Sequence, residues 1–287
     1  MQLKEVRHIL TTSCNLRCKH CYMSAGDNSC SQVSFSQDEF NRFYAYFRPD
    51  VVSATGGEPL LFQEDVLKVA KAVGNYDGAV EVVTNGLLLE EYFIDELKEV
   101  CPNVFFQISL DGCKFYHNYL RGNSEAYGGA MAAINMITTK GIRLKVRMTV
   151  SDENVDQVPS VIHILDVVNL WNDTPISLIL RPVVDQGRAS DNEMKASFHY
   201  KMLDRYQLLP NRITVETTDN VGKCGCGVDT IAIDPKGDIY PCTYFIDKPK
   251  HKMGNITDDF EDISENEEFK NYEGACYARF LDAKLSV

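Results

Sequence analysis

The sequence lacks a long apolar run. No stretch of its 287 residues approaches the roughly 20 consecutive apolar residues that a membrane-spanning helix requires. The most apolar segment, residues 161–168, is interrupted by His163 and Asp166. The N-terminus also lacks the apolar segment of a secretory signal. These absences argue against a membrane protein and predict a soluble, cytoplasmic one.

Positive charge is also scarce. The chain has 29 Lys and Arg residues against 41 Asp and Glu residues, which gives a net charge of −12. A nucleic-acid partner is therefore disfavoured, because phosphate binding needs a basic surface. A neutral or cationic substrate suits this field better. The 44% hydrophobic and 24% charged residues are typical of a globular chain, long enough for one barrel-sized domain with an appendage.

Cysteine, by contrast, is abundant, with ten residues. Without a secretory signal, the thiols are expected to be reduced and metal-bound rather than paired as disulfides. Three of them, Cys14, Cys18 and Cys21, follow an apolar run with the spacing C-x3-C-x2-C. No fourth ligand completes a zinc-knuckle spacing here, whereas three thiolates suit a 4Fe–4S cluster with one open iron. Three incidental thiols are the alternative.

Strands and helices alternate along most of the chain. Ser36 and Glu39 form a capping box before an aromatic helix face that we assign to the core. Strands are expected near residues 5–11, 51–55, 79–84, 104–110, 142–150 and 176–184. Helices are expected near residues 36–47, 63–73, 89–100, 126–140, 155–169 and 192–209. This order predicts an α/β fold with parallel strands, either a barrel or a doubly wound sheet.

Polar or glycine-rich motifs follow the first four predicted strands. They are the cysteine motif, Gly56-Gly57-Glu58-Pro59, Thr84-Asn85-Gly86 and Ser109-Leu110-Asp111-Gly112. The C-terminal ends of parallel strands lie at one edge, so we expect these motifs to face one mouth. The glycines allow close backbone approach to a ligand, and Glu58 offers an acceptor to a ligand ammonium group. Residues 85–86 are read as a strand-to-helix turn rather than a hairpin.

Together these motifs resemble the radical S-adenosylmethionine (radical SAM) enzymes. The resemblance implies a partial (β/α)6 TIM-like barrel, with SAM chelating the open iron of a 4Fe–4S cluster held by Cys14, Cys18 and Cys21. Arg121 would pair with the SAM carboxylate, and a solvated arginine is its alternative. His20 could instead serve packing only. The residues that the resemblance assigns to SAM are His20, Tyr22, Gly56, Gly57, Glu58, Asn85, Ser109 and Arg121.

Cysteines recur near the C-terminus, at Cys224, Cys226, Cys242 and Cys276. Residues 231–240 are expected to form two short strands around a Pro-x-Gly turn that brings Cys242 back towards Cys226. The pattern resembles the SPASM and shorter twitch extensions of radical SAM maturases. It implies a second, auxiliary 4Fe–4S cluster on these four thiols, with structural zinc as the competitor. We therefore divide the chain into a barrel, residues 1–210, and a twitch-like iron–sulfur extension, residues 211–287.

The family's chemistry implies a radical enzyme. An electron from a flavodoxin- or ferredoxin-type donor would cleave SAM to a 5′-deoxyadenosyl radical, which abstracts a substrate hydrogen atom. The expected substrate is a ribosomally made peptide, changed by cross-linking, epimerisation or oxidation. The alternative is a small-molecule epimerase or dehydrogenase acting on an aminoglycoside-like cationic sugar. A plain iron–sulfur electron carrier would leave Glu58 unexplained. Because the motif begins at Cys14, we expect no leader-binding domain before it.

Three cysteines remain outside the two predicted clusters: Cys30, Cys101 and Cys113. Cys101 precedes a strand and is expected to be structural at the closed end of the barrel. Cys113 follows Asp111-Gly112 at the mouth. A thiol S–H bond is weak enough to donate a hydrogen atom to a carbon radical, so Cys113 could make the enzyme an epimerase. Its alternative is a turn residue without chemistry.

Overall fold

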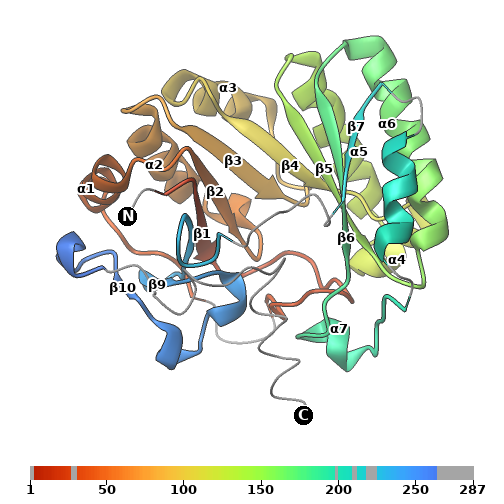
Figure 1. Cartoon of the computed structure of the whole chain (residues 1–287). Coiled ribbons are helices and arrows are strands. Elements are labelled where there is room, and N and C mark those ends of the chain that lie inside the picture. The colour runs from red at the N-terminus through yellow and green to blue at the C-terminus, as the bar shows by residue number, and fades with distance from the viewer. Residues whose placement is uncertain (1–2, 27–30, 198–199, 209–211, 218–224, 264–287) are drawn as a thin grey trace.

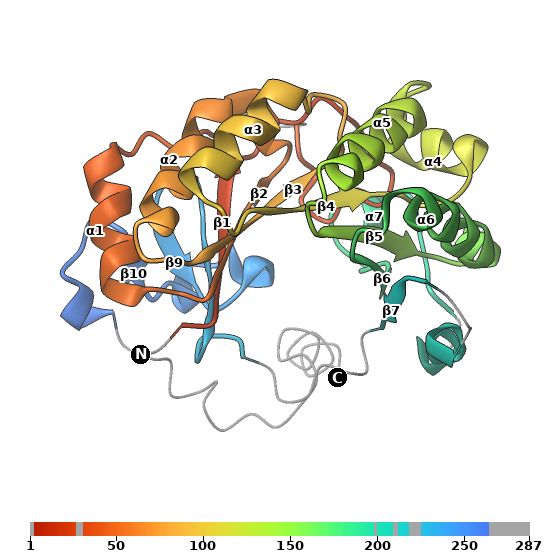
Figure 2. The same ribbon diagram turned by 90° about the horizontal axis from the view of Figure 1, so that it is seen from above.

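A curved sheet with helices along its convex side forms the body of the molecule (Figures 1 and 2). The computed structural model describes residues 3–26, 31–197, 200–208, 212–217 and 225–263. In this part of the chain, no helix is long and apolar enough to cross a membrane.

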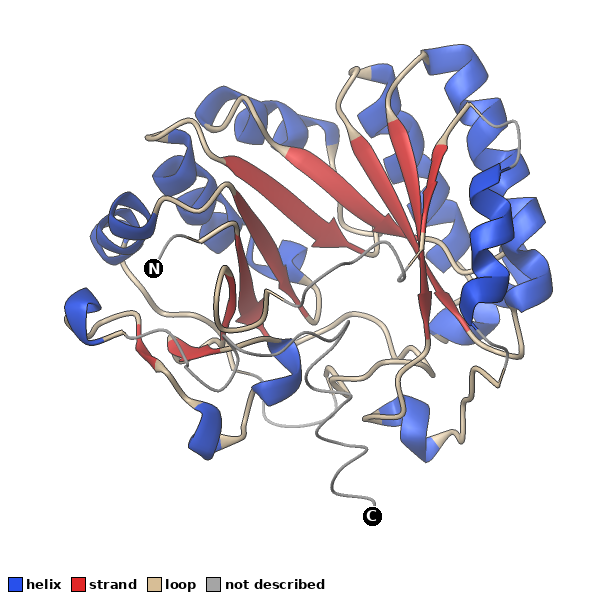
Figure 3. Ribbon diagram, viewed as in Figure 1, coloured by secondary structure: helices blue, strands red, loops and turns tan. Residues whose placement is uncertain are grey.

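The strands that follow the N-terminus pair in chain order, each parallel to the next. They are β1 (Glu5–Thr11), β2 (Val51–Gly56), β3 (Ala79–Thr84), β4 (Phe105–Ser109), β5 (Leu144–Val150) and β6 (Ile176–Pro182). Parallel neighbours need crossover connections, and the helices supply them (Figure 3). The predicted α/β fold with a parallel sheet is confirmed.

The helices agree closely with the periodicity of the sequence in the first half of the chain. Their bounds are α1 (Gln37–Phe47), α2 (Gln63–Gly74), α3 (Glu91–Val100), α4 (Lys114–Arg121), α5 (Ala126–Thr139), α6 (Val158–Asn172) and α7 (Arg188–Asp191). Of these, the sequence did not predict α4 or α7. The short α4 lies directly after the C-terminal end of β4, where it borders the mouth.

Strand β5 shows how the sequence sets the two faces of the sheet. Leu144, Val146, Met148 and Val150 are buried in the core that the sheet shares with the convex-side helices. The residues between them point to the concave side, where Lys145 Nζ lies 2.9 Å from Glu81 Oε1 of β3. A strand in a parallel sheet is usually apolar on both faces. The alternating polar residues of β5 therefore indicate that polar side chains line the concave side of the sheet.

The predicted capping box of α1 is confirmed. The Ser36 side chain accepts from the Glu39 N–H, and the Glu39 carboxylate accepts from the Ser36 N–H at 2.8 Å. The helix then buries an aromatic face that includes Phe43 and Tyr44. The Tyr44 hydroxyl lies 2.7 Å from His8 Nδ1 of β1, which fixes α1 against the sheet.

Both edges of the sheet differ from the prediction. The expected six-strand barrel gains β7 (Thr214–Glu216), which pairs in parallel with β6. At the other edge, β8 (Thr230–Ile233) pairs in parallel with β1 and is followed by the antiparallel β9 (Asp238–Tyr240) and β10 (Gly254–Asn255). The cysteine-rich extension therefore continues the barrel sheet beside β1, a contact that residue order alone could not show.

The single helix expected over residues 192–209 is wrong. Within that range the described residues contain a 3₁₀ helix, Tyr200–Leu208, and α7 ends just before the range, at Asp191. Glu193 adopts a positive φ of 53°, a left-handed conformation that cannot continue an α-helix. A continuous α-helix therefore cannot pass through residue 193.

Candidate active site

The four strand-end motifs meet at one mouth, as predicted. The loop that carries the first three cysteines, residues 12–26 and here called the cysteine loop, lies against the end of β2. The Glu58 N–H donates to the Ser13 carbonyl at 2.8 Å, and the Gly57 N–H donates to the Thr11 carbonyl at 2.8 Å. The Asn85 side chain, after β3, donates to Asn15 Oδ1 at 2.7 Å. These bonds tie the loop to two neighbouring strand ends.

Each of the three thiols in the cysteine loop accepts an N–H group. The donor to Cys14 Sγ is Leu16 N at 3.4 Å, and the donor to Cys21 Sγ is Ala25 N at 3.4 Å. Cys18 Sγ instead accepts from the Arg121 guanidinium at 3.7 Å. Hydrogen bonds to sulfur stabilise thiolate ligands of iron–sulfur clusters and tune their reduction potentials. Three thiols that each accept an N–H group therefore fit a cluster with three protein ligands.

The thiols are close enough to affect one another electrostatically. The pKa of Cys14 is raised to about 11, mainly by burial and also by the charges of Cys18, Glu58 and Cys21, against the effect of the hydrogen bond from Leu16. Burial also raises the pKa of Cys18, while Arg121 lowers it. Burial disfavours the thiolate forms of these residues. A bound metal cation would stabilise the thiolates, since metal binding deprotonates its thiol ligands.

The arrangement does not match a single metal ion. Within the described residues, no group of three Cys, His, Asp or Glu side chains converges as a one-ion site requires. A 4Fe–4S cluster binds each thiolate through a different iron, so it fits sulfurs that share a neighbourhood without sharing one point. The three thiols therefore fit a cluster better than zinc.

Arginine side chains hold the backbone of the cysteine loop. Arg17 donates to the carbonyl oxygens of Cys14 at 3.0 Å and Gly26 at 2.5 Å. From α7, Arg188 donates to the carbonyl oxygens of Cys18 at 2.9 Å and Ala25 at 3.1 Å. The sequence analysis missed Arg188, because nothing in its local pattern indicates a contact with a loop 170 residues earlier.

The paired glycines at the end of β2 are required by the closeness of the cysteine loop. A Cβ atom on Gly57 would lie 2.1 Å from the Ser13 carbonyl oxygen, and one on Gly56 would lie 2.4 Å from the Thr11 carbonyl oxygen. Gly56 also has a positive φ of 154°. Both contacts are to backbone, which cannot move aside as a flexible side chain can. The two glycines therefore allow the start of the cysteine loop to pack against the end of β2.

The Glu58 carboxylate is buried and already makes several hydrogen bonds. Its Oε1 accepts from Thr84 Oγ1 at 2.6 Å and from Leu60 N at 3.1 Å, and its Oε2 accepts from Asn85 N at 2.9 Å. Burial raises the pKa of Glu58 to about 7, against the effect of these donors. One lone pair of Oε2 is left for a ligand. Glu58 thus joins β2 to β3, and its contact with a SAM ammonium group stays a prediction.

Arg121 is a buried partner of Asp111 rather than a solvated arginine. It is the last residue of α4, and its Nε donates to Asp111 Oδ2 at 2.7 Å. Ser109 ends β4 beside Arg147 of β5, with its side chain partly exposed. A SAM carboxylate contact of Ser109 or Arg121 stays a prediction.

The two aromatic residues of the cysteine motif point in different directions. His20 is buried, with Nε2 3.6 Å from Asp111 Oδ2, while its Nδ1 has no hydrogen-bond partner among the described residues. Tyr22 faces the extension: it is hydrogen-bonded to the Thr243 side chain, and its ring centroid lies 5.7 Å from that of Tyr244. Their predicted position near the SAM adenine is not tested by these contacts.

The extension brings two of its four predicted ligands together. Cys226 and Cys242 belong to one small buried cluster with Tyr240 and Phe245. The Gly227 N–H donates to the Pro241 carbonyl at 3.1 Å, so the backbone beside each cysteine is joined. The other two predicted ligands, Cys224 and Cys276, lie outside the described residues.

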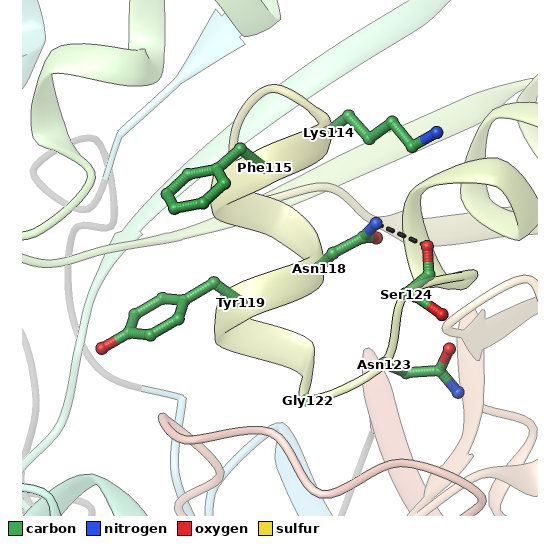
Figure 4. A pocket seen from close by; sticks show the side chains of 7 residues that line it. All are labelled: Lys114, Phe115, Asn118, Tyr119, Gly122, Asn123 and Ser124. Atoms are coloured by element: carbon green, nitrogen blue, oxygen red, sulfur yellow. Dashed lines mark hydrogen bonds between the residues drawn. The ribbon is translucent and has the colours of Figure 1, made fainter.

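The remaining predicted site residue, Cys113, is the N-cap of α4 and is partly buried. Its thiol lies near the Tyr127 hydroxyl of α5, whose pKa is raised mainly by burial and also by Cys113. On the outer side of α4, a separate groove of about 650 Å³ is lined by exposed Phe115 and Tyr119 (Figure 4). The residues that line this groove include no thiol of the cysteine loop, although Lys19 of that loop lies over the Tyr119 ring, with its Nζ 3.5 Å from the ring centroid.

Comparisons with known proteins agree with this site. The family model described as the Radical SAM superfamily matches residues 8–165. A second model, the SPASM iron–sulfur cluster-binding domain, matches residues 224–284. These matches cover both cysteine-rich segments.

Similar proteins include two curated relatives and a solved structure. Pre-heme d1 synthase of Dinoroseobacter shibae is 27% identical over 206 residues, 70% of this chain and 48% of that protein. The antilisterial bacteriocin subtilosin biosynthesis protein AlbA of Bacillus subtilis is 26% identical over 269 residues, 88% of this chain and 58% of that protein. Streptococcus suis SuiB, solved with S-adenosylmethionine, shares the fold, with a TM-score of 0.77 at 16% identity over 98% of this chain and 74% of that chain. The chain spans about half the length of the curated relatives it matches.

The glycine contact gives a direct test of the site. We expect Gly57→Ala to displace the cysteine loop, because its Cβ would meet the Ser13 carbonyl at 2.1 Å. After anaerobic reconstitution, this variant should bind about four fewer irons per chain than the native protein. Gly128→Ala is the matched control, since a Cβ there meets nothing within 4 Å. Equal iron content in all three proteins would contradict the role of Gly57.

Proposed function

The chain belongs to the radical SAM superfamily, and from that premise we propose that it cleaves S-adenosylmethionine reductively and modifies a ribosomally made peptide by hydrogen-atom abstraction. The observation that carries this proposal is the set of three thiols at the mouth, each accepting an N–H group. A purely structural cysteine loop has no need of three such sulfur contacts.

We propose that Cys14, Cys18 and Cys21 hold a 4Fe–4S cluster whose open iron binds SAM. When bound, this group supplies the electron that splits SAM into methionine and a 5′-deoxyadenosyl radical. Glu58 would accept a hydrogen bond from the amino group of SAM through its remaining lone pair. The contacts proposed for the rest of SAM come from His20, Tyr22, Asn85, Ser109 and Arg121. The chain's own contribution is to bind and orient SAM and to exclude water from the mouth.

The extension is proposed to hold a second, auxiliary 4Fe–4S cluster. The ligands would be Cys224, Cys226, Cys242 and Cys276. The presence of Cys226 and Cys242 in one buried cluster and the SPASM match over residues 224–284 support this assignment. Tyr22 reaches from the cysteine loop to Thr243, so the two proposed clusters would face a common interior. A domain boundary near residue 210 remains part of the proposal.

A peptide is the substrate class that the comparisons favour. The match to AlbA, named for bacteriocin subtilosin biosynthesis, runs over 269 residues and 88% of the chain. The match to pre-heme d1 synthase covers only 206 residues and 70%. Because the AlbA match covers more of this chain, it supports a peptide substrate over a tetrapyrrole. Among the described residues, no contact favours the cationic-sugar alternative. Cross-linking, epimerisation and oxidation all remain outcomes of the proposed chemistry.

The remaining parts of the proposal concern partners and location. A flavodoxin- or ferredoxin-type protein would supply the electron, and the enzyme would act in the cytoplasm. The net charge of −12 supports the absence of a nucleic-acid partner.

The central test is iron content together with SAM cleavage. The reconstituted native protein should carry about eight irons and release 5′-deoxyadenosine when reduced by dithionite, whereas Cys14→Ala/Cys18→Ala/Cys21→Ala should keep about four irons and release none. A Cys226→Ala/Cys242→Ala protein should lose the auxiliary iron instead. Continued cleavage of SAM by the first variant would refute the assignment of these three thiols.

The second test concerns Cys113 as a hydrogen-atom donor. If it quenches a substrate radical, the native enzyme should place solvent deuterium in its product in D₂O. Cys113→Ala should still make 5′-deoxyadenosine and yield product without that deuterium. Cys101→Ala is the control, because Cys101 is fully buried and its Sγ lies 3.7 Å from the Gly78 carbonyl oxygen. Native product that carries no solvent deuterium would exclude the donor role.

A further inference from the structure

Asp111 is the most completely enclosed carboxylate near the mouth. Its side chain is fully buried, and each oxygen has its own donor. Oδ1 accepts from the Thr149 N–H of β5 at 3.0 Å, and Oδ2 accepts from Arg121 Nε at 2.7 Å. The Asp111 backbone is fixed as well, because its N–H donates to His117 Nδ1 at 3.0 Å and its carbonyl accepts from Asn154 Nδ2 at 2.9 Å. Because the side-chain oxygens and the backbone of Asp111 all have hydrogen-bond partners, the carboxylate is held in one orientation.

The partner of this carboxylate reaches a proposed cluster ligand. While Nε of Arg121 binds Asp111, its Nη1 lies 3.7 Å from Cys18 Sγ. The guanidinium is planar, so a bond at Nε fixes the direction of the N–H bonds at the other nitrogens. Asp111 thereby directs Arg121 towards the sulfur. Together with burial, the charge of Asp111 also acts on Cys18 itself and raises the pKa of its thiol, in the direction opposite to the effect of Arg121.

The ion pair is buried on both sides, with exposed side-chain fractions of 10% for Arg121 and 0% for Asp111. Removing one member of such a pair leaves an uncompensated buried charge, which strongly disfavours the native position of the remaining group. His20 completes the surroundings, 3.6 Å from Asp111 Oδ2. The position of Arg121 therefore depends on Asp111 more than on Cys18.

We propose that Asp111 is a positioning residue that sets the reduction potential of the cluster by holding the Arg121 guanidinium on Cys18 Sγ. This inference rests on the proposed cluster at Cys14, Cys18 and Cys21. Reduction adds one electron, supplied in the test by dithionite, and so adds one negative charge to the cluster. An N–H donor and a cation at the sulfur stabilise that added charge and raise the potential.

For Asp111→Asn, we expect the reduction potential to change in the direction opposite to that expected from the loss of charge alone. Removing a buried negative charge near the cluster should, by electrostatics alone, make reduction easier and raise the potential. The Asn amide has one acceptor oxygen for two donors, Thr149 N and Arg121 Nε. Arg121 should then lose its anchor and its contact with the sulfur. We therefore expect the potential of Asp111→Asn to fall.

The experiment is an EPR-monitored redox titration of the reconstituted protein without SAM. The signal that changes on later addition of SAM identifies the cluster at the cysteine loop. Arg121→Gln and Asp111→Asn should both shift the one-electron equilibrium towards the oxidised cluster by about tenfold, or 59 mV. Arg188→Gln is the matched control, because Arg188 binds the Cys18 carbonyl at 2.9 Å and not the sulfur. A potential for Asp111→Asn equal to or above that of the native protein would overturn the proposal, as would a fall for Arg188→Gln as large as that for Arg121→Gln.

The double variant Asp111→Asn/Arg121→Gln keeps the test decisive if Asp111→Asn fails to fold. It leaves no unpaired buried charge. If removal of Asp111 lowers the potential only because Arg121 loses its anchor, that fall should disappear once residue 121 is Gln, and the double variant should have a potential equal to or above that of Arg121→Gln. A potential of the double variant clearly below that of Arg121→Gln would mean that Asp111 acts independently of Arg121, which contradicts the proposal. Failure of the native protein to bind iron or cleave SAM would instead refute the proposed function.

Discussion

The close approach of the cysteine loop to the end of β2 constrains the rest of the site. Gly57 faces the Ser13 carbonyl so closely that even a methyl group would not fit between them. This contact places Cys14 close enough to Glu58 for the glutamate charge, together with burial, to raise the pKa of the thiol. The Glu58 carboxylate in turn holds the end of β3 through Thr84. Two glycines and one buried carboxylate therefore position the cysteine loop and also join the ends of β2 and β3.

The distribution of charge is the second organising feature. The whole chain is acidic, with a net charge of −12, yet three arginines bind atoms of the cysteine loop. Arg17 and Arg188 hold its carbonyl groups, and Arg121 reaches a sulfur. A cluster with thiolate ligands is itself negatively charged, so positive charge at the loop opposes the unfavourable field of the acidic chain.

Local signals in the sequence predicted the elements and the parts of the site that lie within one motif. The Ser36–Glu39 cap, the cysteine spacing and the strand-end position of Glu58 each depend on residues a few positions apart. The Asp111–Arg121 pair, the contact of Arg188 and the pairing of β8 with β1 join segments that no local period connects. The helix expected over residues 192–209 is wrong for a different reason, because Glu193 adopts a left-handed backbone conformation that the sequence does not announce.

The proposed function depends above all on SAM binding to a cluster carried by the cysteine loop. Electron–nuclear double resonance on the reduced protein, with SAM labelled by ¹⁵N at its amino group and ¹⁷O at its carboxylate, measures this binding. We expect hyperfine coupling of both labels to the reduced cluster. A reduced cluster that shows no coupling to either label, with SAM present in excess, would contradict it.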